Sequence, residues 1–179
     1  MDLDFNAIIS RVVRVFTFDL TVFREVEEDQ MATQQAWAVV IIAVVASAIG
    51  AAIGSLIAGL GIGSLFGNLI VDPIVRIIGY LLWAFITYWV GVNMFQGEAD
   101  FNEMQRVIGF AYAPNVLGIF SIFSCLGWPI VIIGAIWSLI LVVMAVKEGL
   151  DVDWGSAIVT CIIGWLAYII LAFGIRLIF

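Results

Sequence analysis

The sequence contains no histidine and few charged residues, which make up only 12 % of the 179-residue chain. A soluble globular domain is about a quarter charged and about half apolar. This chain is instead 64 % hydrophobic, with a mean hydropathy of +1.19. Without histidine it has neither the usual general base nor the commonest metal ligand. The composition therefore predicts an integral membrane protein and argues against an enzyme.

Positive charge and cysteine are also scarce. Seven Lys and Arg residues stand against 14 Asp and Glu, a net charge of −7, so the basic footprint that nucleic acid needs is missing. The two cysteines, Cys125 and Cys161, lie in different segments and fit no metal or disulfide spacing. The carboxylates lie outside the cores of the apolar segments, where a proton relay would need them. We therefore expect no catalytic residue, no metal, no cofactor and no nucleic-acid partner.

Long apolar runs fill most of the remaining sequence. A helix that crosses a bilayer needs about 20 such residues, and five segments meet or approach that length. These segments are 36–60, 74–95, 107–124, 129–146 and 156–175. The predicted fold is an all-α integral membrane bundle of about five transmembrane helices, residues 36–179, after a cytoplasmic or interfacial segment, residues 1–35. For the third and fourth segments a re-entrant hairpin is the alternative, because their connection carries no charge.

The distribution of cations predicts the orientation in the membrane. Five of the seven lie in residues 1–35, 96–106 and 147–154, which five spans would place on one side. The positive-inside rule then puts the N-terminus in the cytoplasm. The same segments hold 13 of the 14 acids, so this face is also strongly acidic. Asp2 and Asp4 stand where a signal peptide would carry positive charge, so we expect the first span to stay in the mature chain. The expected location is the cytoplasmic membrane, with several membrane passes.

The segment before the first span predicts an amphipathic helix. Apolar residues recur at helical spacing opposite Arg11 and Arg14: Phe5, Ile8, Ile9, Val12, Val13 and Phe16. Such a helix lies in the membrane interface or packs against the bundle or a partner subunit, and both interpretations stay open. An acidic cluster follows, with Glu25, Glu27, Glu28 and Asp29. We interpret it as an acidic docking face for basic partners.

Small residues recur at every fourth position of the first span. Such rows let helix backbones approach closely in lipid. The predicted helix-packing seam consists of Ala43, Ser47, Gly50, Ala51, Gly54, Ser55 and Gly59. It serves either the bundle itself or a contact between protomers. The glycine-rich residues 59–68 are expected to form the connection to the second span.

Two further pairs of residues predict local features of the helices, an ion pair and a kink. Asp72 and Arg76 are four residues apart, so they face each other on one helix turn, and we expect an interfacial pair there. A charge on a transport path is the alternative. Pro114 removes one helix hydrogen bond, and Asn115 beside it can satisfy a freed backbone group, which predicts a kink or a hinge.

Three segments together resemble one family. They are the entry to the first span, Phe23 to Asp29 with Ala32, Thr33 and Ala36; the start of the third, Arg106 to Asn115; and the fourth, with Ile136, Trp137 and Ser138 before Ala145 to Asp151. Their order and spacing resemble the prokaryotic branch of the Yip-domain (Ypt/Rab-interacting protein) membrane proteins from about residue 17 onward. The resemblance implies five helices and a cytoplasmic N-terminus. Eukaryotic relatives bind prenylated Rab-type GTPases. For the prokaryotic branch the resemblance implies an architecture more than a particular function.

Three functional hypotheses follow. The first is a non-enzymatic membrane scaffold or interaction protein, and the second is an accessory or assembly subunit of a larger membrane complex. The third is a small-solute transporter or channel, which needs a hydrated path lined by Thr87, Asn93 and Asn115. The expected partners are membrane lipids and other membrane protein subunits or a second copy of the chain.

Overall fold

The computed structural model describes residues 4–123 and 127–178, which form helices and no strands. Two short helices, α1 (Phe5–Phe16) and α2 (Thr21–Glu28), come first. The long helices are α3 (Ala32–Ile57), α5 (Asp72–Phe95), α7 (Trp128–Gly149) and α8 (Trp154–Ile178). Between them lie α4 (Ile62–Phe66), the π-helical turn η1 (Gly67–Val71), α6 (Phe101–Ala111) and the 3₁₀ helix η2 (Ala113–Phe123).

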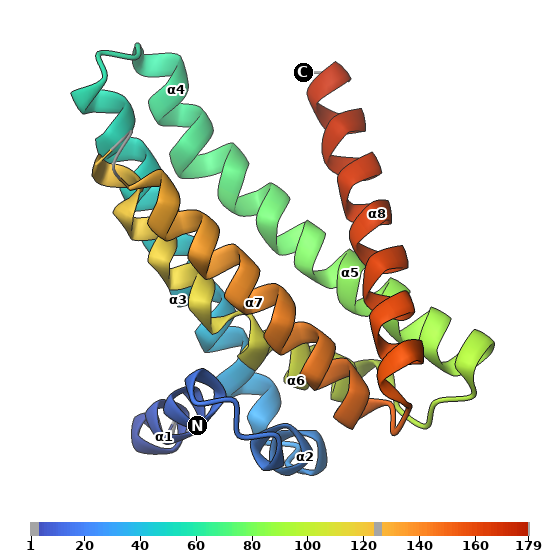
Figure 1. The fold of residues 1–179 in the computed structure, drawn as a ribbon. Coiled ribbons are helices and arrows are strands. Elements are labelled where there is room, and N and C mark those ends of the chain that lie inside the picture. Colours follow the sequence, from blue (N-terminus) through green and yellow to red (C-terminus); the bar gives the residue numbers. More distant parts are fainter. Residues whose placement is uncertain (1–3, 124–126, 179) are drawn as a thin grey trace.

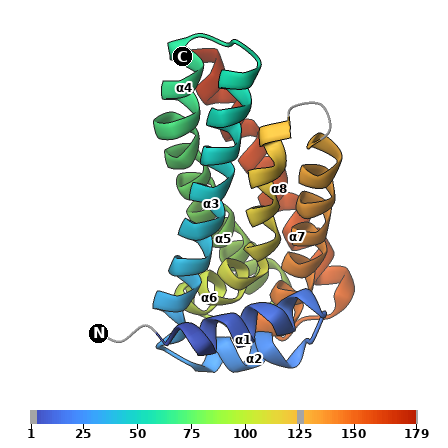
Figure 2. The same ribbon diagram turned by 90° about the vertical axis from the view of Figure 1, so that its left-hand side faces the viewer.

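The long helices run along one another, while α1 and α2 lie across one end of the bundle (Figures 1 and 2). The loops between α5 and α6 and between α7 and α8 are at this same end (Figure 1). The described C-terminal end of α8 is at the opposite end of the bundle (Figures 1 and 2). We call the α1–α2 end, with these two loops, the platform.

In the part of the chain that the structure describes, three helices are long and apolar enough to cross a membrane: α3, the rod Ile62–Phe95 and α7. The pair α6 and η2 gives a fourth if the two helices, bent by 40°, count as one span. This confirms the all-α membrane class, with three or four candidate spans among the described residues, and the expected count of about five stays a prediction. The 25-residue α8 packs against α5 and α7.

The second apolar helix begins earlier than the sequence suggests. Residues 59–68 were expected to form a connection, but the turn is shorter, and α4, η1 and α5 form one rod from Ile62. The π-helical turn η1 joins α4 to α5 without a break in the helix. Such a turn is a local widening of the helix that tolerates glycine. Asp72 and Arg76 therefore lie inside a long helix and not at its N-terminal end.

The buried core is concentrated beside the platform. Eight of the 11 residues of α6 are buried, among α2, α3, α5 and α7. Phe23, Val26 and Phe110 are fully buried there. The outward faces of the long helices expose large apolar side chains instead, such as Ile42 and Ile133. Apolar side chains that are buried beside the platform but exposed along the long helices are expected where lipid covers the long helices and water covers the platform.

Candidate functional site

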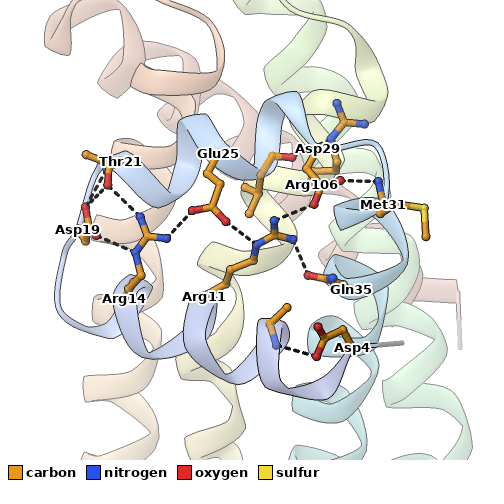
Figure 3. Close-up of polar contacts among 12 residues, drawn as sticks. Asp4, Arg11, Arg14, Asp19, Thr21, Glu25, Asp29, Met31, Gln35 and Arg106 are labelled. Atoms are coloured by element: carbon orange, nitrogen blue, oxygen red, sulfur yellow. Dashed lines mark hydrogen bonds and ion pairs between the residues drawn. The ribbon is translucent and has the colours of Figure 1, made fainter. Parts of the chain in front are cut away.

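Arg11 on α1 joins α1 to the two following helices. Its guanidinium donates hydrogen bonds to Glu25 at 2.9 Å, to Asp29 at 2.7 Å and to the side-chain oxygen of Gln35 at 2.6 Å (Figure 3). The Arg11 side chain is only 11 % exposed. Removing a partner from a charge that is this buried destabilises the fold more than removing one at the open surface. Arg11 therefore fixes α1 against α2 and the start of α3.

Arg14, almost one helical turn further along α1, makes a second set of contacts. It donates to Asp19 and to Thr21, both at 2.9 Å, and pairs with Glu25 (Figure 3). Hydrogen bonds from Thr21 and Arg14 lower the pKa of Asp19 to about 2. The hydrogen bond from Arg14 also holds the pKa of Glu25 below its usual value. These carboxylates are therefore ionised and paired within the chain at neutral pH.

A capping box positions two further carboxylates at the start of α6. The Glu103 backbone N–H donates to Asp100 at 2.8 Å, and the Asp100 N–H donates to the Glu103 side chain at 2.6 Å. This reciprocal arrangement satisfies two backbone donors of the helix end. Acidic side chains there also suit the positive end of the helix dipole.

Arg106 holds the end of α2 onto α6. Its side chain is 6 % exposed and donates to the backbone oxygen of Val26 at 3.0 Å and to that of Glu27. These carbonyls belong to the last turn of α2, the negative end of its dipole, where a cation is favourable. Arg106 thus brings Glu27 close to the capping box on α6.

An acidic cavity of about 400 Å³ opens between α2 and α6. Four carboxylates line it together with one cation: Glu27, Glu28, Asp100, Glu103 and Arg106. Burial raises the pKa of Glu27 to about 7, and the negative charges of Asp151, Glu103 and Glu28 add to the effect. A cavity that disfavours its own negative charge in this way attracts a cationic group.

The predicted acidic face is thus divided into two parts. Glu25 and Asp29 bind Arg11 inside the platform, whereas Glu27 and Glu28 line the cavity. The sequence interpretation missed Asp100 and Glu103, which lie more than 70 residues away along the chain. The Asp-x-x-Glu spacing marks a helix start but says nothing of its neighbour in space.

Two of the three glycines of the predicted seam, Gly50 and Gly54, lie against η2 of the same chain. A Cβ atom on Gly50 would be 2.5 Å from the Ile119 oxygen, and one on Gly54 would be 2.5 Å from the Ser121 oxygen. Ala43, Ser47 and Ser55 are also buried, and Ala51 is half-buried. Gly59 has a φ of +69° in the turn after α3, with no atom near its missing Cβ.

Pro114 and Asn115 lie where α6 ends and η2 begins. Asn115 donates to the Tyr112 oxygen at 3.0 Å and to Ser138 at 2.9 Å, and Ser138 donates to the Ala111 oxygen at 2.9 Å. The carbonyls at the end of α6 are therefore satisfied by side chains. The backbone changes direction by 40° here.

Asp72 and Arg76 form an ion pair on α5, with Arg76 Nε 2.5 Å from Asp72 Oδ2. Arg76 also lines a second cavity, between α5, α7 and α8. Thr87 is buried, Asn93 is exposed and donates to the Trp89 oxygen, and Asn115 lines this second cavity. Of the three polar residues of the expected transport path, Asn115 lines this cavity, and Thr87 and Asn93 are not among its lining residues.

Comparison with known proteins gives one finding. The family model described as the Yip1 domain matches residues 13–175, nearly the whole chain. No curated protein and no solved structure matches. The match agrees with the resemblance found in the sequence.

Proposed function

The chain belongs to the Yip1 family, and on that basis we propose that it is a membrane scaffold whose acidic cavity binds a basic segment of a partner protein. Yip1-domain proteins are non-enzymatic membrane proteins, which fits a binding role. Its location is the cytoplasmic membrane of a prokaryote. Five helices cross the membrane: α3, the rod Ile62–Phe95, α6 with η2, α7 and α8. The platform then faces the cytoplasm.

The acidic cavity is the observation that carries this proposal. Elsewhere on the platform Arg11 and Arg14 pair with carboxylates, so those charges are already compensated. In the cavity four carboxylates face a single arginine, which binds the α2 carbonyls and pairs with Glu103 at 4.0 Å. Burial raises the pKa of Glu27 most, and repulsion from Asp151, Glu103 and Glu28 adds to it; a Lys or Arg side chain from a partner would offset this repulsion.

The test uses the full chain, tagged and purified from native membranes in a mild detergent. Quantitative mass spectrometry compares the proteins bound to the wild type, to the double variant Glu27→Gln/Glu28→Gln and to the control Glu98→Gln. Glu98 is exposed and lies outside the cavity lining. We expect a stoichiometric partner with the wild type and the control. The double variant should lose it, and raising the salt concentration should release it.

A specific observation favours the accessory-subunit alternative. Phe5, Ile9 and Val13 form an exposed apolar strip on α1 and are 63 %, 61 % and 56 % exposed. The strip is one face of the amphipathic helix and suits either lipid at the interface or a partner subunit. If the partner survives Glu27→Gln/Glu28→Gln but is lost on Ile9→Ser/Val13→Ser, the acidic cavity is not the docking site. The protein is then a subunit held through α1.

A further inference from the structure

The exposed apolar strip of α1 lies on the face opposite the two arginines of this helix. Phe5, Ile9 and Val13 form the strip, and each is more than half exposed. At about 100° per residue, Ile9 lies about 160° around the helix axis from Arg11 and about 140° from Arg14. Both arginines bind a carboxylate of α2 (Figure 3). The strip therefore points away from α2.

The direction away from α2 is the direction of the long helices. In Figure 2, α2 lies at the outermost end of the bundle, and α1 lies on the side of α2 that is nearer to the long helices. Ile8 and Val15, on one flank of α1, are buried and hold the helix against the bundle. The helix itself runs across the long helices (Figures 1 and 2). This is the orientation of an amphipathic helix that lies in the plane of a membrane interface.

Two aromatic side chains join this face of α1 to the apolar surface of α7. The ring of Phe16 meets Trp137 of α7 edge-on, with 5.2 Å between the ring centroids, and Phe18 stacks on the same ring at 5.8 Å. Trp137 lies twelve residues before the end of α7 at Gly149, which is about 18 Å along a helix that rises 1.5 Å per residue. The helix α7 is long and apolar enough to cross a membrane, and Ile140, one turn from Trp137, is exposed. The strip is therefore continuous with a surface that lipid covers.

The chain itself compensates the charges of α1. Arg11 and Arg14 are the only charged residues of this helix, and both form ion pairs with carboxylates of the same chain. Interfacial helices commonly turn their Lys and Arg residues to anionic headgroups, and this attraction adds to the burial of the apolar face. In α1 the arginines are turned to α2 instead, and the polar residues that stay exposed, Asn6 and Ser10, are neutral. The exposed surface of α1 thus suits acyl chains without attraction to a charged headgroup.

We propose that the strip of α1 inserts into the bilayer leaflet on the platform side, and that this contact needs no anionic lipid. The strip then lies at the boundary between headgroups and acyl chains, where interfacial helices bury their apolar face by about 5–10 Å. Its occupant is lipid, and neither a partner subunit nor a second copy of the chain. The strip is separate from the acidic cavity, so this proposal does not depend on the scaffold function.

The test places a nitroxide spin label on the strip, in the full chain without Cys125 and Cys161. Ile9→Cys carries the label, and Ser10→Cys, which is also exposed but lies beside the strip, is the matched control on the same helix. Each variant is placed in phosphatidylcholine nanodiscs, and power saturation compares collisions with oxygen, which concentrates in lipid, and with a nickel chelate, which stays in water. The ratio of oxygen to chelate accessibility should be several-fold higher for Ile9→Cys than for Ser10→Cys. Glu98→Cys, in the exposed platform loop, gives the ratio for a label in water.

A second membrane tests the role of lipid charge. Nanodiscs that also contain phosphatidylglycerol should give the same ratio for Ile9→Cys, and lipid exposure that arises only with this anionic lipid would overturn the proposal. Chelate accessibility of Ile9→Cys equal to that of Ser10→Cys would also overturn it, because the strip would then be free for a partner subunit. Protection of Ile9→Cys from both reagents, with spin–spin broadening of its spectrum, would assign the strip to a second copy of the chain and would overturn it as well.

Discussion

At the scale of single residues, arginines organise the platform. Arg11, Arg14 and Arg106 each bind two or more acceptors on other segments. A guanidinium holds several acceptors at fixed angles, which the single ammonium group of lysine cannot do. The three arginines thus set where the carboxylates of α2 point. Glu25 turns toward Arg11 and Arg14 on α1, and Glu27 turns to the acidic cavity.

Glu27 makes the stability of the platform depend on pH. Its pKa is about 7 in the folded chain, above the ordinary value of 4.5, so folding favours the protonated form. Its stabilising contribution is complete below pH 4.5 and is lost as the pH rises through 7. We expect the free energy of unfolding of the wild type to fall between pH 5 and pH 8. Solvent screening limits the loss to on the order of 1 kcal/mol.

The measurement is thermal unfolding in detergent across this range, with the variant Glu27→Gln beside the wild type. The glutamine variant should lose most of the slope, and Glu98→Gln should keep it. Glu25 and Asp19 do not interfere, because their lowered pKa values affect stability only in more acidic solution. Identical slopes in wild type and Glu27→Gln would show that Glu27 is not the titrating group.

Part of this residue-level picture could be predicted from the sequence. The helical spacing identified α1, and the run of acids after it was visible as a cluster. The partners of those acids were not, because Glu27 meets Glu103 only after α6 folds back onto α2. Periodicity along one segment carries no information about which other segment lies beside it.

At the scale of helices, α3 and η2 form the most extensive contact among the described elements. Gly50 and Gly54 let the η2 backbone lie directly on α3. We expect Gly50→Ala to destabilise the fold by about 1–3 kcal/mol, because its Cβ would lie within 2.7 Å of the backbone of Gly118 and Ile119. Thermal unfolding in detergent measures the effect.

Gly63→Ala is the matched control for this substitution. Gly63 lies in α4 with no atom within 4 Å of the added Cβ, so alanine should leave stability unchanged or raise it through helix propensity. A Gly50→Ala variant as stable as Gly63→Ala would mean that η2 does not rest on the α3 backbone.

The helices themselves were predictable where the signal was continuous. The apolar runs identified α3, α7 and α8 within a few residues of their bounds. The third run was expected to be one segment with a kink or hinge at Pro114, and the chain forms α6 and then a 3₁₀ helix there, bent by 40°. The sequence also hid the start of the second helix, because a glycine-rich stretch reads as a turn even where a π-helical segment continues the rod.

At the scale of the whole molecule, charge is distributed very unevenly. Every described carboxylate except Asp72 lies in the platform or its adjoining loops, and the opposite end of the bundle holds no described carboxylate. Five of the seven cations share the platform end, namely Arg11, Arg14, Arg24, Arg106 and Lys147. This distribution, by the positive-inside rule, supports our proposal that the platform faces the cytoplasm.

Five spans predict that the start of α7 lies on the side of the membrane opposite the platform. In a background without Cys125 and Cys161, Trp128→Cys should react with a membrane-impermeant maleimide added outside intact cells, because Trp128 is 68 % exposed. Glu98→Cys, in the platform loop before α6, should react only after the cells are opened. A re-entrant hairpin of α6–η2 and α7 would keep Trp128→Cys inside the bilayer and unlabelled in both conditions. Labelling of Glu98→Cys from outside would reverse the orientation and place the acidic cavity away from any cytoplasmic partner.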